Sequence, residues 1–166
     1  MDRDSLLPFV RFHAWANRRI IDTAALLTDD EFRTIGPLDH GTAFQTLRHL
    51  LDVDWSWREF CTGNDVGESY VWDRIPLDDL ASIAIFSAEE DERLVAYVGS
   101  LGAAALSERL ALGDEKSVPR WLIVAHVVNH GTQHRSELAR YLTECGHSPG
   151  DLDLLDALEL RWPGDG

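Results

Sequence analysis

Hydrophobic residues recur at steps of three and four along four long stretches of this sequence, and this period restricts its fold more than any other feature. Helices that bury one face have this period, whereas the alternating β-branched residues typical of strands are nearly absent. The four stretches predict helices at about 4–27, 42–61, 78–100 and 119–144. Helices of this length pack together as a four-helix bundle, so the predicted fold class is all-α.

The ends of the predicted helices are marked by residues that favour those positions. Thr28 and Glu31, three residues apart, form a capping box and predict a short helical turn after the first helix. Residues 62–76 include several turn-forming Gly and Asn residues and predict a loop. Pro119 suits the first turn of the last helix, and Gly146 suits its end.

The sequence has no internal repeat and no linker rich in Pro, Gly or Ser, so we expect a single domain over residues 1–166. Residues 147–166 predict a loop and a short packed turn or helix, a C-terminal extension of the bundle. The formal net charge of −14 disfavours nucleic acids and anionic membranes as partners. No apolar run approaches the roughly 18 residues of a membrane span. Because the chain also starts without a signal segment and holds two scattered cysteines, Cys61 and Cys145, we expect a cytoplasmic protein.

Three of the seven histidines follow one another at a spacing of four in the segment "AHVVNHGTQHRSEL". On a helix, His126, His130 and His134 fall within one quarter of the circumference, where two imidazoles at i and i+4 can bind one metal ion. They could equally be half-buried polar residues beside Ile123 and Tyr141. A metal site needs a third ligand from another element, because two side chains hold an ion weakly. The remaining histidines that could supply it are His13, His40, His49 and His147.

His49 lies in the middle of the second predicted helix, on a face that is otherwise polar. The other residues of that face are Thr42, Gln45, Thr46, Asp52 and Ser56. Two interpretations are open. The face is exposed to solvent, or it lines a polar cleft between the second and the last helix. In the second case Asp52, less than one turn from His49, is the carboxylate best placed to orient it or to accept a proton.

Three blocks of the sequence resemble the DinB-like (DinB/YfiT) superfamily of four-helix-bundle proteins. They read "FHAWANRRIIDTAALLTDDEF", "TLRHLLDVDWSWREF" and "HVVNHGTQHRSELARYLTECGHSPGDLDLLD", and their order and spacing fit that superfamily. The resemblance implies a DinB/YfiT-type bundle that binds one divalent metal ion through His49, His130 and His134. It implies nickel or zinc first, with iron, manganese or cobalt as alternatives, and a homodimer.

The resemblance also bears on residues beside these ligands. His126 precedes the ligand pair by one turn, and we expect it to line the pocket or to support a ligand. Relatives commonly have Gly-Gln after the His134–Arg135 dipeptide, whereas this chain has Ser136 and Glu137. Glu137 lies within the histidine sector, so it either accepts the second N–H of a ligand histidine or pairs with a neighbouring arginine.

Trp15 and Asn17 match a signature of the superfamily. We expect Trp15 to pack between helices and Asn17 to make a buried amide hydrogen bond.

Three neutral imidazoles leave at least one coordination position open, which is the ligand count of a catalytic metal centre. Such a centre acidifies a water or a thiol that binds to it. By resemblance we expect a thiol-dependent S-transferase or a hydrolase acting on a small molecule, the thiol being of low molecular weight. The alternative is a non-catalytic metal- or ligand-binding bundle, which a fourth protein ligand would favour. The ordinary histidine pKa predicts that metal affinity falls between about pH 6 and 5.

Overall fold

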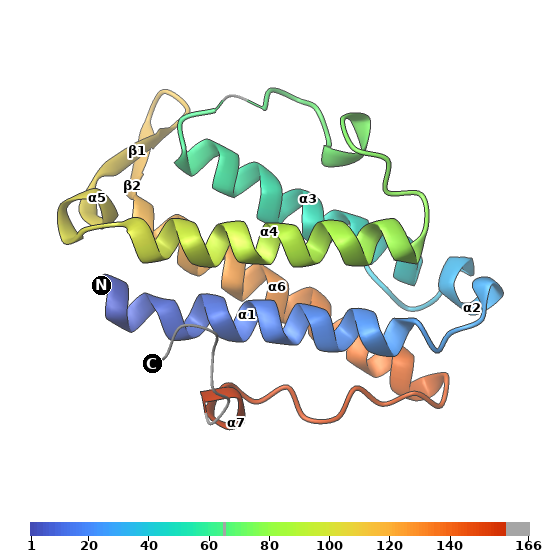
Figure 1. The fold of residues 1–166 in the computed structure, drawn as a ribbon. Coiled ribbons are helices and arrows are strands. Elements are labelled where there is room, and N and C mark those ends of the chain that lie inside the picture. The colour runs from blue at the N-terminus through green and yellow to red at the C-terminus, as the bar shows by residue number, and fades with distance from the viewer. Residues whose placement is uncertain (65, 159–166) are drawn as a thin grey trace.

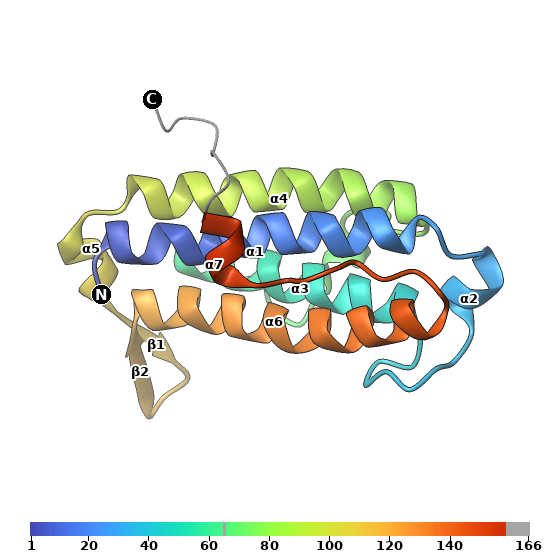
Figure 2. The same ribbon diagram turned by 90° about the horizontal axis from the view of Figure 1, so that it is seen from below.

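The computed structural model describes residues 1–64 and 66–158, and its four long helices form the predicted bundle. These are α1 (Arg3–Ala24), α3 (Ala43–Cys61), α4 (Leu80–Ser100) and α6 (Arg120–Glu144). Each of α1 and α3 packs against both α4 and α6, so the four helices surround one core (Figures 1 and 2). The all-α fold class is therefore confirmed. None of the helices in the described part of the chain has both the length and the apolar run that a membrane crossing requires.

The expected helix starts are present with their capping hydrogen bonds. Thr28 and Glu31 make the predicted capping box of the short helix α2 (Asp29–Arg33). Thr42 caps α3 by accepting from the Gln45 N–H, and Asp79 caps α4 by accepting from the Ser82 N–H. These side chains satisfy backbone N–H groups that have no partner within the helix, so the starts were readable from the sequence.

Two connections differ from the sequence-based expectation. The 62–76 loop contains a 3₁₀ turn, η1 (Val71–Asp73), and the connection from α3 runs back along the bundle, so that α3 and α4 point the same way (Figure 1). The segment between the third and the last predicted helix had no predicted element. It forms α5 (Ala103–Ser107) and an antiparallel hairpin of β1 (Arg109–Leu112) and β2 (Lys116–Pro119).

Pro119 ends β2 and is the N-cap residue of α6, whereas the sequence placed it in the first turn of that helix.

The described part of the predicted C-terminal extension, residues 147–158, packs on α1, and residues 159–166 lie outside the described structure. Its last described element is α7 (Leu154–Leu158), which lies beside α1 in Figure 1. Ala157 is buried against Phe12 and Ala16, and the Pro149 carbonyl accepts a hydrogen bond from Arg19 Nε at 2.6 Å. Both cysteines lie at helix ends: Cys61 is the last residue of α3, and Cys145 is the C-cap of α6.

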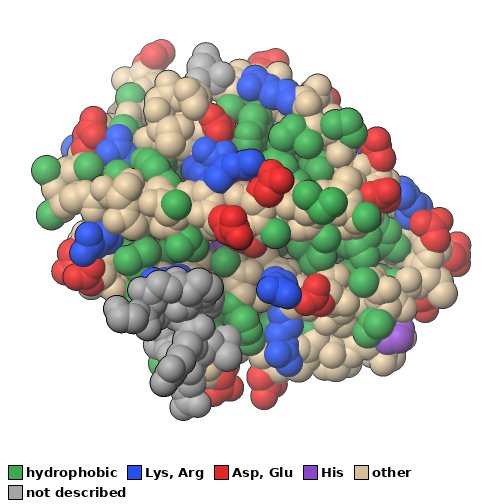
Figure 3. Space-filling model, viewed as in Figure 1, with side chains coloured by type: hydrophobic (Ala, Val, Ile, Leu, Met, Phe, Trp, Pro, Cys, Tyr) green, Lys and Arg blue, Asp and Glu red, His purple; other side chains and the backbone are tan. Residues whose placement is uncertain are grey.

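Apolar side chains fill both ends of the bundle, and polar side chains occupy its middle. One apolar cluster lies near α2 and includes Leu47, Leu51, Phe86 and Leu138, all buried. The other lies near the hairpin and includes Leu6, Val10, Leu94 and Val127. Each such buried side chain contributes about 1.5–3 kcal/mol to folding. On the face drawn in Figure 3, acidic and basic side chains are interspersed among apolar ones.

Candidate metal centre

The histidines of α6 face α3, but they differ in depth. His134 is buried with 4 % of its surface exposed, His130 is half-buried and His126 is exposed. His49 projects from α3 toward the same point. The Nε2 atom of His130 lies 3.1 Å from Nε2 of His49 and 3.1 Å from Nε2 of His134. The polar face of α3 thus lines an interhelical site, and the structure brings together the three residues predicted as ligands.

The close approach of three imidazole nitrogens fits a cation better than it fits hydrogen bonds. In a neutral imidazole, Nε2 has either one N–H or one lone pair in the ring plane, so His130 Nε2 cannot make two well-directed bonds. Three lone pairs converging on one ion satisfy all three nitrogens. Two nitrogens bound tetrahedrally to one zinc ion at about 2.0–2.1 Å lie roughly 3.4 Å apart, close to the spacing observed here.

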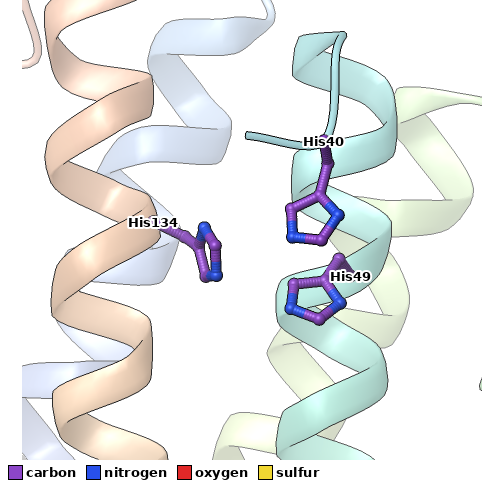
Figure 4. A group of neighbouring side chains, drawn as sticks. All are labelled: His40, His49 and His134. Carbon is purple, nitrogen blue, oxygen red and sulfur yellow. The ribbon is translucent and has the colours of Figure 1, made fainter. Parts of the chain in front are cut away.

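A fourth histidine, His40, joins the cluster from the loop that precedes α3. Its ring stacks on that of His49 with centroids 3.8 Å apart, and one ligand atom from each of His40, His49 and His134 lies within 4.8 Å of the others. Figure 4 shows the His134 ring on α6 facing the other two. The loop turns at Gly41, whose φ of 81° favours glycine. The sequence marked His40 only as one of four candidates, because a loop residue has no helical face.

Burial keeps the imidazoles of His49 and His130 neutral at physiological pH. It lowers the pKa of His49 to about 4, with a further effect from the neighbouring His40 and His134. Burial and the nearby His134 and His49 lower the pKa of His130 to about 4 as well. The pKa of His40 is also lowered, first by burial. Protons should therefore compete with a metal ion for His49 and His130 only below the range of about pH 6 to 5 that the sequence predicted.

Glu137 lies beside a histidine of the site. Its Oε1 is 3.4 Å from His134 Nδ1, while its Oε2 accepts from the Asp39 N–H at 3.4 Å. The His134 contact lacks hydrogen-bond alignment, and Nδ1 of both His134 and His130 is buried without a hydrogen-bond partner among the described residues. Of the two roles open to Glu137, its place favours support of a ligand histidine. It also ties the His40 loop to α6.

Asp52 lies in the pocket beside the site, but its carboxylate is hydrogen-bonded to the backbone of η1 and not to a histidine. Its Oδ1 accepts from the Val71 backbone N–H at 2.7 Å and so holds η1 against α3. Burial raises the pKa of Asp52. The same pocket of about 560 Å³ is lined by His40, Gln45, Arg48, His49, Asp52, Tyr70 and Trp72. Asp52 is thus placed to act on a ligand in the pocket while it anchors η1.

His126 lies one turn beyond the site and lines a different cavity from the pocket beside His49. Its ring centroid is 6.0 Å from that of His130, and it packs edge-on against Trp57 at 5.6 Å. His126 and Trp57 both line a second cavity of about 530 Å³ between α6 and the hairpin. His147, the remaining candidate from the sequence, follows the end of α6, where its N–H donates to the Leu142 carbonyl at 2.8 Å.

A second cluster of possible ligands lies in the centre of the bundle, formed by His13, Asp54 and Asp91. Arg135, 2 % exposed, donates to His13 Nδ1 at 3.0 Å and to Asn17 Oδ1 at 2.7 Å. Because arginine only donates, His13 must accept at Nδ1 and donate from Nε2 to Asp54 Oδ2, 2.9 Å away. The lone pairs of His13 are thereby used, and a cation already occupies the cluster.

Asn17 completes this buried network. Its Nδ2 donates to Asp91 Oδ1 at 3.0 Å and to Asp54 Oδ2 at 3.4 Å, which confirms the expected buried amide. Burial raises the pKa of Asp91 well above its ordinary value, and burial lowers that of Arg135 to about 10. We call His13, Asn17, Asp54, Asp91 and Arg135 the core network. It joins α1, α3, α4 and α6.

Gly131 permits the close approach of α6 to α1 at the core network. A Cβ atom at this position would lie 2.5 Å from both Arg135 Nη1 and His13 Cε1. Arg135 follows His134 directly, so the contacts that fix Arg135 also fix the turn of α6 that presents His134 to the histidine site. The core network therefore positions the site without belonging to it.

Comparison with known proteins agrees with this architecture. The DinB family matches the sequence over residues 1–164. The crystal structure of a DinB-like protein from Bacillus subtilis superposes with a TM-score of 0.63 at 15 % sequence identity, covering 87 % of this chain and 93 % of that one. At this identity the superposition supports the fold alone. Among curated proteins, none matches the sequence.

Proposed function

The chain belongs to the DinB family, and from that premise we propose that it binds one divalent metal ion between α3 and α6 through His49, His130 and His134. The observation that carries this proposal is the position of His130 Nε2, 3.1 Å from the Nε2 atoms of both other ligands. The low pKa values of His49 and His130 support it, because a metal ligand must be unprotonated. Nickel and zinc suit an imidazole site, and iron, manganese and cobalt are the alternatives.

We further propose that the site serves a metal-dependent enzyme of the S-transferase or hydrolase type. A divalent ion with three imidazole ligands supplies a Lewis acid that acidifies a water or a thiol bound to it. The chain's own residues would hold the reactants: the pocket beside His49 offers the Gln45 amide and the Asp52 carboxylate. Glu137 would keep the His134 ring oriented. A cytoplasmic location and a homodimer belong to the same proposal.

One observation favours a second function, a closed metal-binding site without catalysis. His40 lies within reach of the same ion as His49 and His134. Four histidine ligands would complete a tetrahedral zinc site and leave no position for a reactant. The two functions therefore differ in whether His40 binds the ion.

Metal analysis of single variants tests the ligand set. We expect His49→Ala, His130→Ala and His134→Ala each to lower metal occupancy sharply, and His126→Ala, whose side chain is exposed, to lower it far less. If His40→Ala abolishes binding while His130→Ala does not, the ion is held by His40, His49 and His134 instead. Equal loss in His126→Ala would contradict both ligand sets.

Spectra of the cobalt-substituted protein test the open position. A low-molecular-weight thiol that binds the ion should produce a sulfur-to-metal charge-transfer band, because a coordinated thiolate is deprotonated. The band should be absent in His49→Ala. If fully loaded wild-type protein does not respond to millimolar thiol but His40→Ala does, His40 closes the site, and the non-catalytic function is the better account.

A further inference from the structure

The pocket beside the histidine site contains an arginine with an unusual environment. Among the arginines that the structure describes, Arg48 alone has neither a hydrogen bond nor an ion pair, and its Nε is buried without a partner. Its guanidinium lies over two aromatic rings, 4.4 Å from the centroid of Trp72 and 5.0 Å from that of Phe44. The rings hold the cation in place but leave its N–H donors unused.

A carboxylate that could pair with Arg48 is available within the same helix. Asp52 lies four residues after Arg48 on α3, a spacing at which side chains of opposite charge meet. The Asp52 carboxylate instead accepts the Val71 N–H, which fixes η1 and the aromatic residues around it. In a chain of net charge −14, an arginine without a carboxylate partner at a pocket wall indicates an anion that comes from outside the chain.

The shape of the pocket narrows the class of anion. The planar guanidinium fork of arginine matches the two oxygens of a carboxylate. Tyr70 and Trp72 stack with centroids 4.6 Å apart and 8° between their planes, and both line the pocket. Tyr70 and the Arg48 guanidinium both lie over the Trp72 ring, so the aromatic surface left to a ligand is that of Tyr70, which is 52 % exposed. The carbon frame of a small acid would contact this surface.

We propose that Arg48 binds the carboxylate of a small organic acid in the pocket that Tyr70 and Trp72 also line, next to the histidine site. This inference rests on the proposed function, because it describes the substrate of the same site. Arg48 would fix one end of the substrate and direct the other toward His40 and His49, which line the same pocket. The histidines would meet the reacting group and the arginine the carboxylate.

The test measures binding to metal-free protein, where a carboxylate cannot bind to the ion. We would titrate 4-fluorobenzoate and its neutral analogue 4-fluorobenzamide, following the fluorine NMR signal. The wild-type protein should bind the acid at millimolar concentration or below, and more tightly than the amide. Arg48→Met keeps most of the apolar side chain and removes the charge. It should weaken acid binding about tenfold or more and leave amide binding unchanged. Arg48→Lys keeps a positive charge and should weaken acid binding less than Arg48→Met does.

Arg33→Met is the matched control. Arg33 also lies over the Phe44 ring, at 4.5 Å, but it pairs with Asp29 and is not among the residues that line the pocket. The Arg33→Met variant should bind the acid as tightly as the wild type does. The proposal is overturned if the acid does not bind to wild type, if the amide binds equally well, or if Arg48→Met and Arg48→Lys retain full affinity. Metal analysis of wild-type protein before the ion is removed decides the metal proposal separately, since the titration needs no ion.

Discussion

The described part of the chain contains two clusters of possible metal ligands, and they differ in how their buried polar groups are paired. In the core network, Asn17 donates to both carboxylates and Arg135 donates to His13, so that of the two carboxylates only Asp54 Oδ1 is left buried without a partner among the described residues. In the histidine site, nitrogens face one another across α3 and α6, and Nδ1 of His130 and His134 lacks a partner among the described residues.

The difference shows that proximity of ligand atoms does not by itself define a metal site. His40, His49 and His134 meet the same distance requirement as His13, Asp54 and Asp91. Only the histidine site brings several imidazole nitrogens together with no cation among them. The core network has its own cation in Arg135, and a second, divalent ion there would be repelled. The core network therefore should matter for stability, and the histidine site for ligand binding.

The largest expected effect is on stability, from removing the cation of the core network. Arg135→Met leaves His13 Nδ1 and Asn17 Oδ1 without their buried donor and removes the cation near Asp54 and Asp91, so we expect a loss of about 3–5 kcal/mol in the free energy of unfolding. Urea denaturation of metal-free protein measures it. Arg18→Met is the control, because its pair with Asp22 is exposed and should contribute less than about 1 kcal/mol. Equal effects of the two substitutions would refute the structural role of the core network.

Removing the metal should lower stability without unfolding the bundle. The ion would join only α3 and α6, whereas the core network and the two apolar clusters remain. We expect helical circular dichroism to persist after chelation. The melting temperature should fall, since an ion present at 100 times its Kd adds about 2.7 kcal/mol. Loss of the helical signal on chelation would show that the fold depends on the ion. The histidine site would then serve stability, as the core network does.

A smaller effect should come from the carboxylate beside His134. Glu137→Gln keeps the size of the side chain and removes the charge near Nδ1, so we expect metal affinity to fall about tenfold. Competition with a chelator of known affinity measures the change. Glu144→Gln serves as the control, because Glu144 pairs with Arg140 at the exposed end of α6. Unchanged affinity in Glu137→Gln would limit Glu137 to holding the His40 loop.

The smallest effect concerns pH. The pKa values of His49 and His130 are about 4 in the folded protein, below the ordinary value of 6.5. The unfolded chain therefore binds protons first, and stability that is fully present above about pH 6.5 is lost as pH falls toward 4. After a discount for solvent screening, we expect a loss on the order of 1 kcal/mol in metal-free protein.

Other groups titrate in the same range, so a difference between variants isolates the histidine site. The double variant His49→Gln, His130→Gln lacks both imidazoles and should lose less stability than wild type between pH 7 and 4.5, as measured by urea denaturation. Parallel loss in both proteins would assign the pH dependence to other groups, such as His13 in the core network.

The sequence by itself determined the four helices and the spacing of the histidines on α6. Both depend on local rules: the helical period places His130 and His134 on one face, and Thr28 and Thr42 satisfy the N–H groups of the turns that follow them. The three proposed ligands were named only with the help of the family resemblance. The structure then placed them within one interhelical site.

Other features were decided only by the tertiary structure. His40 joins the site from a loop. Asp52 accepts a hydrogen bond from the Val71 backbone, and Arg135 is buried in the middle of the core. None of these follows from a local pattern, because each depends on which segments distant in sequence are packed together. An arginine in particular is expected at the surface, and its burial becomes favourable only when α1 and α3 bring His13, Asn17 and Asp54 around it.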